Sequence, residues 1–105
     1  MDSKISVIRR CSGSHVRIET LYGNYWLSPD ETNSLLFFGN EIPLRTDGGV
    51  IDGEALAYLH TSGEKRRVII RTPHFSFSVI DTALISVVKG QWATAPLKEY
   101  SRAAP

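Results

Sequence analysis

The clearest alternation of apolar and polar side chains lies between residues 74 and 80. Phe75, Phe77 and Val79 occupy every second position there, and histidine or serine fills the positions between them. Because residues two apart on a strand share a face, this pattern predicts a half-buried strand with its phenylalanines in the core. The alternative is an exposed platform for stacking bases. That arrangement would remove two of the chain's four phenylalanines from a small core.

Alternation also predicts a meander of strands at the start of the chain. Residues 4–10 and 15–21 are rich in β-branched side chains and flank the turn sequence CSGS, so they are expected to pair as a hairpin. Gly23-Asn24 offers the positive φ of a tight turn, and YWL then begins a third strand.

A short helix is predicted over residues 29–38. Ser28 can cap its first turn, Pro29 suits the first helical position, and Gly39 can end it. The apolar stripe of this helix is expected to contain Leu35, Leu36 and Phe38.

The pattern beyond the helix is less distinct. NEIPLR is interpreted as an edge strand, because Pro43 removes a donor from a ladder, and TDGG as a turn. Residues 52–62 fit either a helix capped by Asp52 or strands, with Asp52-Gly53 as a hairpin turn. We favour strands, with residues 55–60 and 65–72 paired around TSGE.

Residues 82–90 also fit two structures. Asp81 or Thr82 could cap a second short helix that Gly90 ends, whereas the β-branched run at 85–88 suits a strand equally well. Both alternatives stay open from the sequence.

These elements predict one α+β domain over residues 1–97, mostly an antiparallel β meander with one or two short helices, and a tail over residues 98–105. The order of features in the first half recurs in the second, where Val16, Ile18 and Thr20 have counterparts in Val68, Ile70 and Thr72. This recurrence suggests an internal duplication of a β-β-β-α unit.

Composition is that of an ordinary globular domain, with 105 residues, 42% of them hydrophobic and 22% charged. Its one cysteine, Cys11, cannot close an intramolecular disulfide, and the sequence contains no apolar run of membrane-span length. We therefore expect a cytoplasmic protein with no membrane association.

Charge is divided along the chain. The net charge is +1, but residues 29–54 hold six acids against one base, Arg45, so this segment sums to −5 and the remainder to +6. Such segregation suggests an acidic and a basic face.

No sequence motif for catalysis, a cofactor or a phosphate-binding loop occurs. Cys11, His15, His60 and His74 have poor spacing for a zinc site. We therefore expect no metal, no cofactor and no enzymatic activity, with a small-molecule enzyme built around the three histidines as a remaining alternative.

The sequence favours a non-enzymatic binding module, by default a homodimer, that acts as a protein-interaction or structural subunit through aromatic residues of the types enriched at interfaces. These are Tyr22, Tyr25, Trp26 and Trp92. The alternative is a regulatory protein that binds single-stranded DNA or RNA through a basic strand face. Its candidate residues are Arg9, Arg10, Arg17, Lys65, Arg66, Arg67, Arg71 and His74 for phosphates, and Trp26 and Trp92 for bases.

Overall fold

The computed structural model describes residues 5–47 and 49–99. Its strands form a nine-stranded sheet in the order β8-β1-β2-β3-β4-β5-β6-β7-β9, in which every described pair is antiparallel. The elements follow in chain order as β1 (Ile5–Cys11), a 3-10 turn (Ser12–Ser14), β2 (His15–Thr20), β3 (Gly23–Leu27), α1 (Pro29–Phe38), β4 (Ile42–Thr46), β5 (Ile51–Ser62), β6 (Lys65–Arg71), β7 (Phe75–Ile80), α2 (Asp81–Val88), β8 (Trp92–Pro96) and β9 (Lys98–Glu99). The predicted antiparallel α+β domain is thus confirmed, with two helices.

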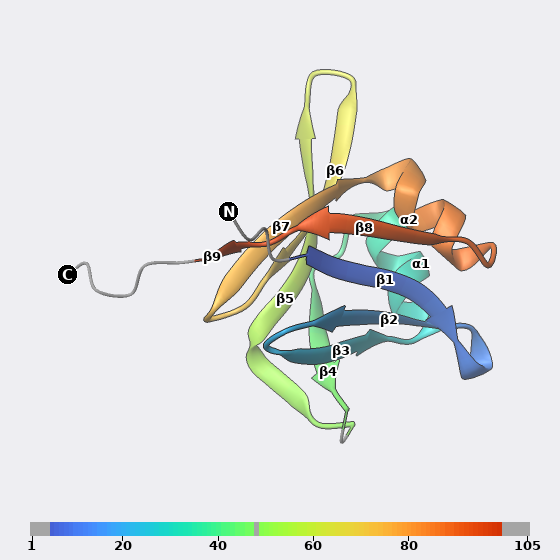
Figure 1. Ribbon diagram of the computed structural model, residues 1–105. Helices are drawn as coiled ribbons and strands as arrows, with labels where there is room; N and C mark the ends of the chain where they lie inside the picture. The colour runs from blue at the N-terminus through green and yellow to red at the C-terminus, as the bar shows by residue number, and fades with distance from the viewer. Residues whose placement is uncertain (1–4, 48, 100–105) are drawn as a thin grey trace.

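The sheet curls until its two ends meet along one segment of chain (Figure 1). β8 pairs with β1, and β9, one residue further on, pairs with β7. Residues 92–99 therefore connect both ends of the meander, and the architecture is nearly that of a barrel. The β5–β6 hairpin extends beyond this barrel (Figure 1).

One hydrophobic core joins the inner face of the sheet to both helices. Phe75, Phe77 and Val79 are buried in it, as the alternation predicted. The helices contribute Leu35, Leu36, Leu84 and Val87. Side chains at the intervening strand positions lie on the opposite face, which we call the outer face.

Helix α1 begins and ends where the sequence predicted. Ser28 Oγ accepts from the backbone N–H of Glu31 at 3.1 Å, and the Ser28 N–H donates to Glu31 Oε1 at 2.8 Å, which completes a capping box. Gly39 ends the helix in the left-handed region, with φ of 68°. The expectation that Phe38 joins the apolar stripe is wrong, because its side chain is 76% exposed in the last turn.

Strand β4 is not an edge strand, since it lies between β3 and β5. Proline is tolerated because Pro43 pairs only with Leu56 of β5, whereas pairing to β3 involves Arg45 and Thr46. A register shift between Pro43 and Arg45 marks this irregularity. Asp52-Gly53 is also not a turn, because both residues lie inside β5.

Residues 52–62 form strand and residues 81–88 form helix, which settles both ambiguous segments. Neither Asp81 nor Thr82 caps α2, because Ile80 occupies the N-cap without a side-chain hydrogen bond. The turn before β3 lies at Leu21-Tyr22, whereas the sequence had predicted it at Gly23-Asn24. Gly23 begins β3 directly after the turn and has the positive φ, 132°.

The element order β-β-β-α-β occurs in each half of the chain. Order alone does not distinguish a repeat from coincidence, so the duplication stays a prediction. The predicted tail starts within β9, and residues 100–105 lie outside the described part of the chain. Within the described residues, neither helix has the length and apolar character needed to span a bilayer.

Candidate functional site

A row of aromatic and cationic side chains crosses the outer face of the first half of the sheet. The register pairs Trp92 with Arg9, Arg9 with Arg17, Arg17 with Trp26, and Trp26 with Arg45. Directly opposed residues in antiparallel strands point to the same face, so these side chains are neighbours. We call this set, Trp92, Arg9, Arg17, Trp26 and Arg45, the Trp–Arg row. It runs perpendicular to the strands, from β8 to β4.

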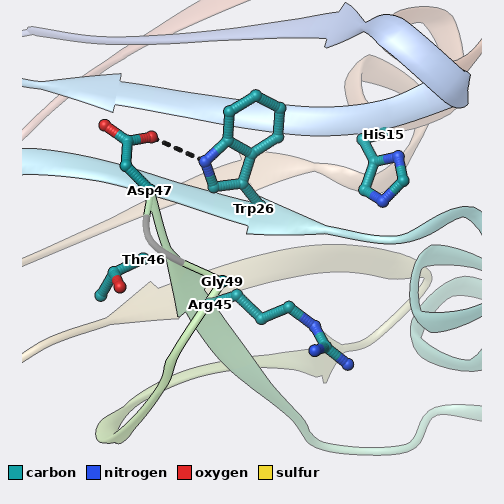
Figure 2. Close-up of a pocket in the computed structure, with 6 residues that line it drawn as sticks. All are labelled: His15, Trp26, Arg45, Thr46, Asp47 and Gly49. Atoms are coloured by element: carbon teal, nitrogen blue, oxygen red, sulfur yellow. Dashed lines mark hydrogen bonds between the residues drawn. The ribbon is translucent and has the colours of Figure 1, made fainter.

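Trp26 is held in place from several directions. Its indole N–H donates to Asp47 Oδ1 at 2.7 Å, and the Arg17 guanidinium carbon lies 4.9 Å from the ring centroid in cation–π geometry. His15 meets the ring edge-on, with centroids 6.3 Å apart. Figure 2 shows the indole between Asp47 on one side and His15 on the other. These contacts give the ring one orientation.

Both carboxylate oxygens of Asp47 accept hydrogen bonds that hold the Trp26 ring in place. Oδ2 accepts from Asn24 Nδ2 at 2.9 Å, and Arg17 Nη2 lies 4.0 Å from Oδ1. The hydrogen bond from Asn24, the bond from Trp26 and the charge of Arg17 together hold the pKa of Asp47 below its usual value. At neutral pH the carboxylate is therefore ionised.

Two arginines of the row share one carboxylate. Arg9 donates to Glu19 Oε2 through Nε at 3.2 Å and Nη2 at 2.8 Å. Arg17 Nε lies 3.1 Å from the same oxygen, at ion-pair distance, yet it is buried without a hydrogen-bond partner among the described residues. One negative charge thus faces two guanidinium groups in the middle of the row.

At the other end of the row, Arg45 is tied to helix α1. Its Nε and Nη2 donate to the two carboxylate oxygens of Glu31, at 3.5 and 3.2 Å. Partial burial acts to raise the pKa of Glu31, but the Ser28 N–H and the Arg45 cation outweigh it and lower that pKa. The capping box and the row are therefore connected through Glu31.

The surface is hollowed beside each tryptophan of the row. The hollow at Trp26 has a volume of about 300 Å³ and is lined by His15, Trp26, Arg45, Thr46, Asp47 and Gly49 (Figure 2). The hollow at Trp92 has a volume of about 370 Å³ and is lined by Val7, Arg9, Arg10, Glu19, Gly90, Gln91 and Trp92. Trp92 itself is 69% exposed. Each hollow is large enough for a group the size of a nucleobase.

The sequence had named four members of the row, Arg9, Arg17, Trp26 and Trp92, without predicting that they are neighbours. Arg10 points to the helix side, where Nη1 donates to the Val88 carbonyl at 3.5 Å. It also lines the hollow beside Trp92, although it is not a member of the row.

Consecutive cationic residues of β6 are separated by the structure. Lys65 lies at the exposed tip of the β5–β6 hairpin. Arg66 is on the helix side, where it donates to the Leu36 carbonyl and lies 3.7 Å from Asp81 Oδ2. Arg67 is on the outer face and donates to Ser78 Oγ at 3.0 Å. This cluster in the sequence is therefore not a cluster in space.

The remaining phosphate candidates lie outside the row. Arg71 is exposed at the end of β6, and His74 lies in the β6–β7 turn, where its ring stacks on Tyr22 at 6.3 Å. Tyr25, expected among the interface aromatics, is only 6% exposed and packs against Phe75 in the core.

The three histidines have different neighbours. His15 lines the hollow at Trp26, His60 pairs with Arg67 in the β5–β6 hairpin, and His74 lies near Tyr22. Across residues 5–47 and 49–99, no group of three or more His, Cys, Asp or Glu side chains could hold a metal ion.

Sequence inspection missed Arg45, Asp47, Glu19 and Glu31 as parts of the site. In the sequence, Asp47 and Glu31 stand out only as acids of the segment 29–54, and Arg45 only as its one base. Their places in the site depend on pairing between strands that are distant in the chain. The only local signal was the capping position of Glu31, three residues after Ser28.

Searches of protein-family models, curated proteins and solved structures found no match to this chain.

Proposed function

We propose that this protein is a non-enzymatic binding module that takes single-stranded nucleic acid across the Trp–Arg row. The observation that carries the proposal is the cross-strand register, which places two tryptophans and three arginines in one line on the outer face. Aromatic rings that stack on bases, together with cations that contact phosphates, are the combination used to bind single strands.

The spacing of the row suits an extended strand. Trp92 and Trp26 are three interstrand steps apart, so their Cα atoms lie roughly 14 Å from each other. Two bases separated by one or two nucleotides could reach the two rings, and the phosphates between them would pass over Arg9 and Arg17. The hollows beside the rings leave room for the bases.

The carboxylates of the site lower the affinity for phosphate but do not neutralise all the arginines of the row. Arg9 and Arg17 share Glu19, so a phosphate that approaches them meets two guanidinium groups and one carboxylate. Arg9 is 52% exposed, and exposed ion pairs contribute only about 0 to 1 kcal/mol, so phosphate oxygens can replace the carboxylate as the partner of Arg9. We therefore expect moderate affinity with a clear dependence on salt.

Fluorescence anisotropy tests the proposal with a labelled oligothymidine of about nine nucleotides, alongside the same strand in a duplex. We expect saturable binding of the single strand, weaker binding of the duplex, and a slope near −1.4 in a plot of log K against log salt, as for two phosphate contacts, at Arg9 and Arg17, of about −0.7 each. A Kd weaker than about 10⁻⁴ M for the single strand would contradict the proposal.

A second candidate function, assembly with a second copy of the chain, is favoured by the end of α1. Phe37 and Phe38 are adjacent there and are 69% and 76% exposed. Each ring could contribute roughly 1.5 to 3 kcal/mol if it were fully buried in an interface. We propose that a homodimer of the binding module forms through this end of the helix, away from the Trp–Arg row.

Light scattering on a size-exclusion column tests the dimer. The expected result is a dimer that becomes a monomer in the Phe37→Ser/Phe38→Ser variant and stays a dimer in Leu21→Ser, a control whose leucine is 75% exposed in the β2–β3 turn. A monomeric parent protein would exclude this candidate.

The proposal assigns no reaction, cofactor or metal to the protein, and it keeps the cytoplasmic location expected from the sequence. The alternative of a small-molecule enzyme would require a pocket that brings catalytic groups together, whereas the histidines have separate neighbours. Nucleic acid is preferred to a protein as the partner of the row because two of its arginines lie between two aromatic rings along one line.

A further inference from the structure

The hollow beside Trp26 combines an aromatic ring, an oriented arginine and few open acceptors. Trp26 and Arg45, which are directly paired between β3 and β4, both line it, together with Thr46 and Gly49 near the β4–β5 turn. Figure 2 shows the Arg45 guanidinium on the same side of the indole as His15. A planar ligand in this hollow could therefore contact the indole and direct one edge to Arg45.

Glu31 determines which N–H groups of Arg45 remain available to a ligand. The Nε and Nη2 groups face the two oxygens of that carboxylate, so one side of the guanidinium is occupied. The end formed by Nη1 and Nη2 carries further N–H donors in a fixed fork. The Arg45 side chain is 40% exposed, so this end is accessible from solvent.

The carboxylate acceptors in the same hollow are already engaged. Asp47 accepts from Trp26 through one oxygen and from Asn24 through the other. The Thr46 hydroxyl donates to the Val50 carbonyl at 3.3 Å. The hollow therefore presents donors to a ligand more readily than acceptors.

From this arrangement we infer that the hollow beside Trp26 is a base-reading pocket for guanine, with Arg45 donating to the O6 and N7 atoms. This inference rests on the proposed function and specifies the base preferred at one position of the bound strand. Guanine offers two adjacent acceptors on that edge, which match two parallel N–H donors. Adenine places an amino donor beside N7, so its edge opposes the same arginine.

The test uses the unmodified protein and labelled oligothymidines with one central substitution. The three probes carry dG, dA or 7-deaza-dG, which lacks the N7 acceptor and keeps the Watson–Crick edge of guanine. We expect the dG strand to bind roughly tenfold more tightly than the dA strand, and the 7-deaza-dG strand to lose most of this advantage.

Two variants locate the preference. Arg45→Met should remove the difference between the dG and dA strands, whereas Arg9→Met, in the same row on β1, should weaken binding to both and leave their ratio unchanged. The oligonucleotide comparison needs no variant, so it decides the question even if Arg45→Met does not fold.

The results that would contradict the guanine pocket differ from the result that would contradict the proposed function. Equal affinity for the three strands would overturn the guanine pocket and leave the proposed function in place. A dG preference that persists in Arg45→Met would also overturn it, because another group would then read the base. Absence of binding to any of the strands would overturn the proposed function and this inference together.

Discussion

The outer faces of the two halves of the sheet differ in kind, although both carry arginines. The first half, from β8 to β4, carries two Trp and three Arg in one cross-strand row that is linked to Glu19, Asp47 and Glu31. On the outer face of β6, Arg67 lies opposite His60 and Ile80 and donates to Ser78, and no tryptophan stands beside it in the register. The two halves therefore differ in the position of their cations relative to tryptophan, and the density of cations in the sequence does not predict that difference.

The largest expected difference between the halves concerns the tryptophans. Trp26→Ala should weaken binding of a single-stranded oligothymidine by about ten- to a hundredfold, because stacking contributes roughly 1 to 3 kcal/mol per base. Trp92→Ala should have an effect of the same order, and its exposed ring can be removed with little cost in stability. The measurement is fluorescence anisotropy, with Tyr58→Ala on β5 as the aromatic control. An equal loss in the control would remove the distinction between the halves.

The arginines of the two halves should also differ in their effect on binding, and this effect on affinity should be smaller than that of the tryptophans. The double variant Arg9→Met/Arg17→Met should lower affinity by about fivefold or more and reduce the magnitude of the salt slope by roughly 1.4, as for two lost phosphate contacts. Arg67→Met, in the second half, should leave the slope unchanged. If Arg67→Met changed the slope as much as the double variant, the nucleic acid would lie across both halves.

Glu19 offers a test in the opposite direction. Glu19→Gln removes the carboxylate that Arg9 and Arg17 share, so phosphate no longer competes with it and affinity should rise by about threefold. Ser78→Ala, beside Arg67, serves as a control that leaves affinity unchanged. A decrease in affinity for Glu19→Gln would indicate that this carboxylate orients the arginines for binding instead of competing for them.

The smallest effect is the pH dependence of the contacts around Trp26. The folded pKa of Asp47 is lowered from 3.8, so the bonds from Asn24 and Trp26 to its carboxylate persist above that value and are lost only as pH falls through the lower folded pKa. In a His15→Gln/Trp92→Phe background, which removes the imidazole beside Trp26 and the second tryptophan, Trp26 fluorescence should stay constant from pH 7 down to about 4 and change only below it. A transition centred above 3.8 that disappears in Asp47→Asn would contradict this assignment.

Local patterns were sufficient to predict several elements of the fold. The sequence from Ser28 to Gly39 carries both ends of α1, and alternation at Phe75, Phe77 and Val79 identifies a half-buried strand, because these signals depend on neighbouring residues. The errors occurred where distant pairing decides the outcome. Pro43 suggested an edge, but a register shift allows it between two strands.

The candidate site could be predicted only in part for the same reason. Trp92, Arg9 and Trp26 were individually plausible, but their alignment depends on register between strands far apart in the chain. Conversely, Arg66 and Arg67 are adjacent in sequence and point to opposite faces, since side chains alternate along β6. Sequence proximity was therefore a poor guide to which cations share a surface.

Chemical-shift mapping by NMR tests the Trp–Arg row most directly. An unlabelled oligothymidine is added to ¹⁵N-labelled protein while the indole N–H signals of Trp26 and Trp92 and the backbone amides of residues 60–65, at the tip of the β5–β6 hairpin, are followed. We predict that both indole signals shift in proportion to occupancy and that the hairpin amides do not. Shifts confined to the hairpin, with both indole signals unchanged, would contradict the central claim that nucleic acid binds across the row.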